Sequence, residues 1–149
     1  MHKIIVASDV PTIRKAVRQA IDLAGPSVEE ASSGARTLAM IADDPPDLAI
    51  LDMQIGSMGG IAICLEMRLE ESYGRLPHIP VLMLLDRRAD VFLARRIHAE
   101  GWILKPLDPI RIKKAAETIL NGRAFYDHRY TPVPTLTPAL PTLNAAESR

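Results

Sequence analysis

The sequence lacks a second cysteine, a net charge and any apolar run long enough to span a membrane. A lone cysteine, Cys64, cannot form an internal disulfide, and the opening residues MHKIIVASD do not have the layout of a signal peptide. We therefore expect a cytoplasmic protein. Balanced charge gives no electrostatic reason to expect a nucleic-acid or membrane partner, and no helix-turn-helix pattern occurs.

Apolar runs that alternate with helical patterns are what the sequence does contain. The runs predict strands at residues 4–7, 48–51, 79–85 and 102–104, with a weaker edge strand at 27–31. Helical spacing predicts helices from Pro11, over 35–41, 61–69 and 89–98, and from Pro109 to Leu120 behind an Asp108 cap. Strands that alternate with helices indicate an α/β fold, a doubly wound five-stranded parallel sheet of flavodoxin-like order.

The length fits one domain, which we expect to span residues 1–122. Residues 123–149 are expected to form a flexible tail or linker, because from Thr131 onward they are rich in proline and threonine and have no helical period. This segment either leads to an effector domain or is a frayed terminus, and its composition favours neither.

Three charged residues follow predicted strands whose ends lie together in this fold. Asp9 follows the first strand, Asp52 the central one and Lys105 the last one. Two carboxylates with nearby backbone carbonyls suit magnesium, and a facing lysine supplies a point charge for a phosphoryl oxygen. Neither common glycine-rich phosphate loop occurs, so the sequence predicts a site that holds a phosphoryl group covalently.

Three motifs resemble the receiver domain of bacterial two-component response regulators. They are PDLAILDMQIGSMGG at 46–60, IPVLMLL at 79–85 and GWILKPLDP at 101–109. The resemblance extends from about Lys3 to Leu120, which is nearly all of the chain expected to be ordered.

The resemblance implies a role for each matching residue. Asp52 would accept a phosphoryl group from the phosphohistidine of a sensor histidine kinase or phosphotransfer protein. Asp9, Asp52 and the backbone carbonyl of Gln54 would bind Mg²⁺, and Lys105 would pair with the phosphoryl oxygens. A protein output partner or a missing effector domain would receive the signal.

Four positions depart from the family pattern. Ser8 replaces the first of two acids, which should weaken magnesium binding. Leu85 replaces the Thr or Ser whose hydroxyl grips the phosphoryl group, so the usual switch lacks a hydrogen-bond donor. Asp86 replaces a small residue and would either repel a phosphoryl dianion or pair with Lys105. Trp102 occupies the position of the switch aromatic, where we expect a large, half-buried side chain.

Basic residues surround Trp102 in the sequence, and Trp and Arg are enriched in interface hot spots. They are Arg87, Arg88, Arg95, Arg96, Arg111 and Lys113. We expect a protein-docking face here, and the resemblance adds that dimers form on the corresponding face. For each arginine alone, the alternative is a solvated helix face.

Three hypotheses follow. The first is an atypical receiver phosphorylated on Asp52, which the intact Asp9, Asp52 and Lys105 favour. The second is a pseudo-receiver that binds proteins irrespective of phosphorylation, which Ser8, Leu85 and Asp86 favour. The third is an unrelated α/β enzyme, and the absence of a histidine base at any predicted strand end counts against it. We rank the first modestly above the second and expect no enzyme.

Overall fold

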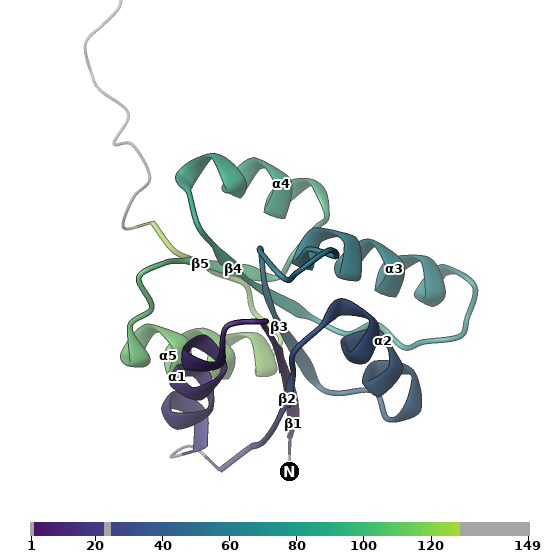
Figure 1. Ribbon diagram of the computed structural model, residues 1–149, viewed down its shortest axis with the longest axis horizontal. Coiled ribbons are helices and arrows are strands. Elements are labelled where there is room, and N and C mark those ends of the chain that lie inside the picture. The colour runs from purple at the N-terminus through teal and green to yellow at the C-terminus, as the bar shows by residue number, and fades with distance from the viewer. Residues whose placement is uncertain (1, 23–24, 129–149) are drawn as a thin grey trace, which may run out of the picture.

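The computed structural model of the chain describes residues 2–22 and 25–128. Six parallel strands form one sheet in the order β2-β1-β3-β4-β5-β6 (Figure 1). The strands are β1 (Lys3–Ala7), β2 (Ser27–Ala31), β3 (Leu48–Asp52), β4 (Val81–Leu85), β5 (Gly101–Leu104) and β6 (Phe125–Tyr126). The predicted flavodoxin-like parallel sheet is confirmed, with β6 as an added edge strand.

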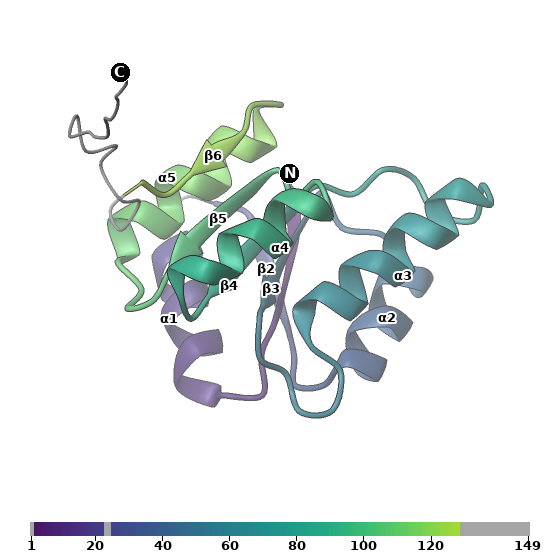
Figure 2. The ribbon, with the colours of Figure 1, turned by 90° about the horizontal axis from the view of Figure 1, so that it is seen from above.

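Helices cover both faces of the sheet, as Figures 1 and 2 show. They are α1 (Pro11–Asp22), α2 (Gly34–Asp43), α3 (Gly60–Ser72), α4 (Val91–Arg96) and α5 (Pro109–Leu120). Helices α1 and α5 pack on one face, and α2, α3 and α4 pack on the other. Alternate residues of each strand enter the two cores, so Ile4 faces α1 and α5 while Ile5 faces the opposite layer.

Local chemistry sets several boundaries. Asp108 caps α5 as predicted, accepting a 2.9 Å hydrogen bond from the Ile110 amide, with Pro109 at the first helical position. Strand β4 begins later than predicted, at Val81, since Pro80 has no amide to donate to the ladder.

The helix predicted over residues 89–98 is divided in the structure. Its first turn is a 3₁₀ helix (Arg88–Asp90), and α4 then ends at Arg96. Asp90 is buried and accepts a 3.0 Å hydrogen bond from the amide of Arg87, which fixes the start of this turn.

Ordered structure continues past the predicted domain boundary at residue 122. Strand β6 pairs with β5 inside the segment expected to be a tail, and Asp127 is fully buried behind it. A strand of two residues has no alternation that a sequence pattern could reveal. The rest of the expected tail, residues 129–149, lies outside the described residues. Within residues 2–22 and 25–128, no helix is long and apolar enough to cross a membrane.

Candidate functional site

The predicted site residues come from four strand ends at one edge of the sheet. Asp52 is the last residue of β3, and Ser8, Asp86 and Lys105 directly follow β1, β4 and β5. These ends meet where the strand order reverses, the position at which open α/β sheets bind ligands.

The Asp52 carboxylate is buried and accepts three hydrogen bonds. Ser8 Oγ donates to Oδ2 at 2.7 Å, while Lys105 Nζ and the Gln54 amide donate to Oδ1 at 2.6 and 3.2 Å. A buried carboxylate must be paired to remain charged, and these donors provide that pairing. They use three of about four lone-pair directions, which leaves one for a ligand.

The direction of the Ser8 hydrogen bond is fixed by a second contact. Ser8 is fully buried, and its Oγ accepts a 3.1 Å hydrogen bond from the amide of Val10. A hydroxyl that accepts from an amide turns its own proton elsewhere, and here that proton points to Asp52. Ser8 therefore donates a hydrogen bond to the Asp52 carboxylate, where an acid would place a second negative charge beside it.

Lys105 bridges two carboxylates. Its Nζ lies 2.6 Å from Asp52 Oδ1 and 2.9 Å from Asp86 Oδ1. Burial lowers the pKa of Lys105, but hydrogen bonds and charges from Asp52 and Asp86 outweigh burial and raise the pKa above its ordinary value. The lysine is thus a charged ammonium, and of the two arrangements expected for Asp86 the structure has the pairing with Lys105.

Asp9 follows Ser8 directly, is exposed, and makes its hydrogen bond outside this cluster. Its Oδ2 accepts a 2.8 Å hydrogen bond from the amide of Gly56, which has a φ of 46°. That left-handed backbone favours glycine, so Gly56 holds Asp9 against the loop after β3. Sequence reasoning missed this contact, although a glycine shortly after the end of β3 was a signal for it.

The residues present fit a magnesium ion with few protein ligands. Asp9 and Asp52 offer the carboxylate oxygens that magnesium prefers, and this ion often takes only one or two carboxylates and keeps several waters. Among residues 2–22 and 25–128, no group of three or more His, Cys, Asp or Glu is placed to hold a metal. Any magnesium site here therefore depends on two acids and backbone or water oxygens.

Leu85 is fully buried at the end of β4, where its register partner is Leu104 of β5. Its side chain can neither donate nor accept a hydrogen bond, so this position offers nothing polar to the site.

Trp102 is only 3% exposed, more buried than predicted. Tyr126 stacks on its ring with centroids 4.4 Å apart, and the Arg95 guanidinium lies 5.6 Å from the ring centroid. Two of the six basic residues are engaged within the chain, since Arg111 pairs with Asp127 and Arg87 with Asp90, although the Arg87 side chain is still 75% exposed. The predicted docking face is thus partly covered by the chain itself.

Comparison with known proteins identifies the family. The model of the response regulator receiver domain matches residues 4–117. The nitrate/nitrite response regulator NarL of Escherichia coli K12 is 30% identical over 132 residues, covering 87% of this chain and 60% of NarL. The probable transcriptional regulator ycf27 of Guillardia theta is 27% identical over 135 residues, covering 87% of this chain and 51% of ycf27.

Solved structures agree. The Vibrio cholerae chemotaxis response regulator CheY4 superposes with a TM-score of 0.70 at 27% identity, over 78% of this chain and 97% of CheY4. The signal receiver domain of a NarL from Mycobacterium tuberculosis superposes with a TM-score of 0.69 at 33% identity, over 82% of this chain and 98% of that domain.

The chain spans about half the length of the curated relatives it matches. Receiver domains are signalling modules that pair with histidine kinases and output domains, and phosphorylation on aspartate with Mg²⁺ is typical of them. The match over residues 4–117, the strand order and the Asp52–Lys105 pair together show that this chain belongs to the response regulator receiver domains of two-component phosphorelay signalling.

Proposed function

We propose that this chain is an atypical receiver in which Asp52 accepts a phosphoryl group and signals through protein contacts. The observation that carries the proposal is the 2.6 Å pair between Lys105 Nζ and Asp52 Oδ1 at the strand-reversal edge of the sheet. An acceptor carboxylate with a fixed ammonium beside it is equipped for phosphoryl transfer, which depends mainly on positioning and charge stabilisation.

The transfer would proceed by attack of an Asp52 carboxylate oxygen on the phosphorus of a phosphohistidine. The new O–P bond forms as the P–N bond breaks, and the electron pair of the broken P–N bond returns to the imidazole of the donor. Lys105 is placed to neutralise charge on the equatorial oxygens. A magnesium ion held by Asp9, Asp52 and the Gln54 carbonyl would supply further neutralisation.

Ser8 would make the resting site tolerant of magnesium loss and would also weaken the ion's binding. With serine in place of an acid, one negative charge is missing from the ligand set. The hydroxyl also occupies a lone pair of Asp52 Oδ2 that a metal could otherwise take. Phosphorylation should therefore require more magnesium than a site with two acids beside Asp52.

The alternative is a pseudo-receiver that binds partners irrespective of phosphorylation. Two contacts favour it. Lys105 is already shared with Asp86 at 2.9 Å, and the buried Ser8 hydrogen bond satisfies Asp52 without a phosphoryl group. Leu85 further removes a hydroxyl whose new contact would distinguish the phosphorylated state from the resting one.

The partners proposed are a sensor histidine kinase or phosphotransfer protein as donor, and an output protein or effector domain as recipient. The longer curated relatives, about half of whose length this chain spans, support an effector domain elsewhere on the polypeptide. A homodimer is a further proposal. We also propose a cytoplasmic location, since the single cysteine is a buried free thiol.

The deciding experiment is binding of beryllofluoride, a stable mimic of aspartyl phosphate, to the full chain with magnesium. Amide NMR shifts report it, and Asp52→Asn is the matched control. Saturable shifts at Ser8, Gln54 and Lys105 that the control lacks would support a working acceptor. Absence of binding at high magnesium would make the chain a pseudo-receiver.

A further inference from the structure

Strand β6 is held on the open edge of β5 by the main chain. The Phe125 amide donates to the carbonyl of Glu100 at 3.0 Å, and the Asp127 amide donates to the carbonyl of Trp102 at 3.1 Å. The register pairs Gly101 with Phe125 and Trp102 with Tyr126. These groups would otherwise be the unpaired ladder positions of an edge strand.

Side chains complete this attachment. The carboxylate of Asp127 is fully buried, where it accepts a 3.0 Å hydrogen bond from the Leu104 amide and pairs with Arg111 at 3.2 Å. One residue earlier, Tyr126 stacks on Trp102. The ring of Tyr126 is thus matched by the ring of Trp102 on β5. The acid that follows it, Asp127, is matched by the Leu104 amide and the Arg111 guanidinium.

Gly101 shapes the β5 edge for close approach. A Cβ atom on Gly101 would collide with the backbone carbonyl of Phe125 and would lie 2.9 Å from Cδ1 of Ile119. Any larger residue would push a neighbouring strand away from β5. The edge therefore carries a built-in recess for a second backbone.

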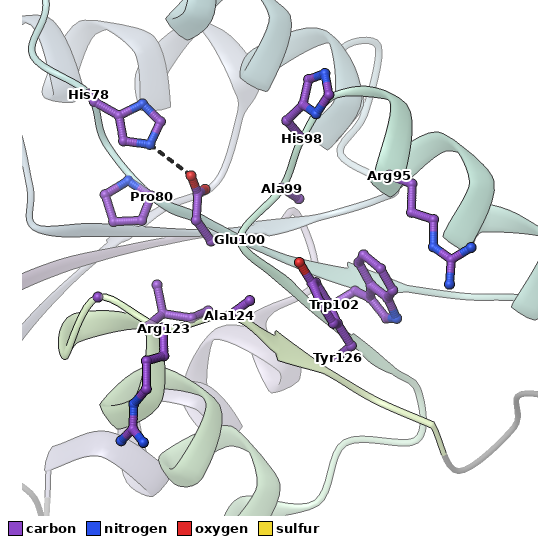
Figure 3. A pocket seen from close by; sticks show the side chains of 12 residues that line it. His78, Pro80, Arg95, His98, Ala99, Glu100, Trp102, Arg123, Ala124 and Tyr126 are labelled. Atoms are coloured by element: carbon purple, nitrogen blue, oxygen red, sulfur yellow. Dashed lines mark hydrogen bonds and ion pairs between the residues drawn. The ribbon is translucent and has the colours of Figure 1, made fainter.

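Space remains beside β6. A cavity of about 680 Å³ lies there between the end of α4, β5 and β6 (Figure 3). Trp102 and Tyr126 form one wall, and Glu100, held by His78 at 2.7 Å, forms another. Tyr126 is 43% exposed, so solvent reaches the outer side of the strand. Release of this two-residue ladder would withdraw Phe125 from the core beneath α1 and α5 and would uncover Trp102. A strand that displaces β6 must therefore replace these contacts.

We propose that the β5 edge is a docking groove for an extended peptide segment, and that residues 125–127 fill it in cis. The partner it fits is a strand that runs parallel to β5 and carries an aromatic residue followed by an acidic one. The aromatic ring would stack on Trp102, and the carboxylate would reach the Leu104 amide and Arg111. Such a partner must first displace β6. The inference does not depend on phosphorylation of Asp52.

The test uses the full chain with Tyr126→Ala and Asp127→Ala, which empties the groove of its own side chains. The probe is a synthetic peptide with the sequence of residues 123–128, RAFYDH. Emission of Trp102, the only tryptophan, and the amide shifts of Gly101 and Leu104 report binding. The double variant should bind the peptide saturably. The unmodified chain should bind at least about tenfold more weakly, because its own strand competes at high effective concentration.

Two controls keep the outcome specific. A peptide with serine for tyrosine and asparagine for aspartate should not bind, and adding Arg111→Met to the double variant should abolish binding of the original peptide. If the double variant fails to fold, Asp127→Asn alone takes its place. A folded variant that does not bind the peptide, or an unmodified chain that binds it equally well, would overturn the proposal. Beryllofluoride binding in the same variants separates this result from a defect at Asp52.

Discussion

The hydroxyl of Ser8 donates a 2.7 Å hydrogen bond to Asp52 Oδ2, across 44 residues of sequence and inside the protein. An acid in place of Ser8 would put a second negative charge beside Asp52, which a cation would have to compensate. Serine avoids that repulsion, and its hydroxyl instead makes an attractive hydrogen bond to Asp52. The resting site is therefore complete with protein groups alone, and this predicts how it responds to substitution.

Ser8→Asp should lower the stability of the metal-free protein and raise its affinity for magnesium. Without magnesium, the variant should unfold more easily, because two carboxylates would share a buried position and the hydrogen bond to Asp52 would be lost. With magnesium, the added carboxylate should tighten binding of the ion. Thermal unfolding with and without magnesium measures both effects. Ser8→Ala is the control: it should lose about 1 to 3 kcal/mol of stability and gain less magnesium affinity than Ser8→Asp, because it frees a lone pair of Asp52 but adds no charge.

Asp86→Ala should speed phosphorylation of Asp52 by a small phosphodonor. The substitution removes one of the two carboxylates that hold Lys105 and the negative charge that repels an incoming phosphoryl group. Intact-protein mass spectrometry measures the rate, with Asp86→Asn as the isosteric control. An unchanged rate in both variants would show that Asp86 does not limit the transfer.

Combining Leu85→Thr with Asp86→Ala should strengthen the structural response to phosphorylation. The new hydroxyl supplies a hydrogen bond that forms only with the phosphoryl group, which raises the preference for the active arrangement by about 1 to 3 kcal/mol. The measurement is the spread of beryllofluoride-induced amide shifts from Asp52 towards Trp102. If partner affinity and shifts match those of the unmodified chain, this account of the switch is wrong.

Stability should depend on Lys105 in a defined pH range. Because the pKa of Lys105 is raised in the folded protein, its contribution is complete below its ordinary pKa and is lost as pH rises through the folded value. The difference in unfolding free energy between the unmodified chain and Lys105→Met should stay constant from about pH 7 to 10 and shrink above pH ~10.4. Urea titrations at each pH measure it. A difference that grows above that pH would contradict the assignment.

Cys64 should be inert in the folded protein. It is fully buried, and burial raises the pKa of its thiol to about 11, so the reactive thiolate is scarce at pH 8. A thiol reagent should label it only as the chain unfolds, at a rate that increases with urea. Rapid labelling of the native protein would show that α3, which carries Cys64, opens locally.

The sequence alone was sufficient for the fold class and for the closeness of Asp52 and Lys105. Periods of two and of 3.6 residues are local properties, so the alternating strands and helices could be found without a structure. The ends of parallel strands meet by topology, and of the predicted set Asp9, Asp52 and Lys105 the structure pairs Asp52 with Lys105 while Asp9 bonds to the amide of Gly56.

Only the tertiary structure decided which hydrogen bonds Ser8 and Lys105 donate to Asp52. It alone also showed that β6 covers the start of β5, at the end of the strand away from Lys105. The Ser8 bond to Asp52 depends on the register of β1 against β3 and on the amide of Val10, neither of which has a sequence pattern. Strand β6 was missed for the same reason. Two residues have no period, and their place is set by a recess at Gly101 and a buried carboxylate at Asp127. Hydrogen bonds between distant residues require both backbones to be in place, and that information exists only in the folded chain.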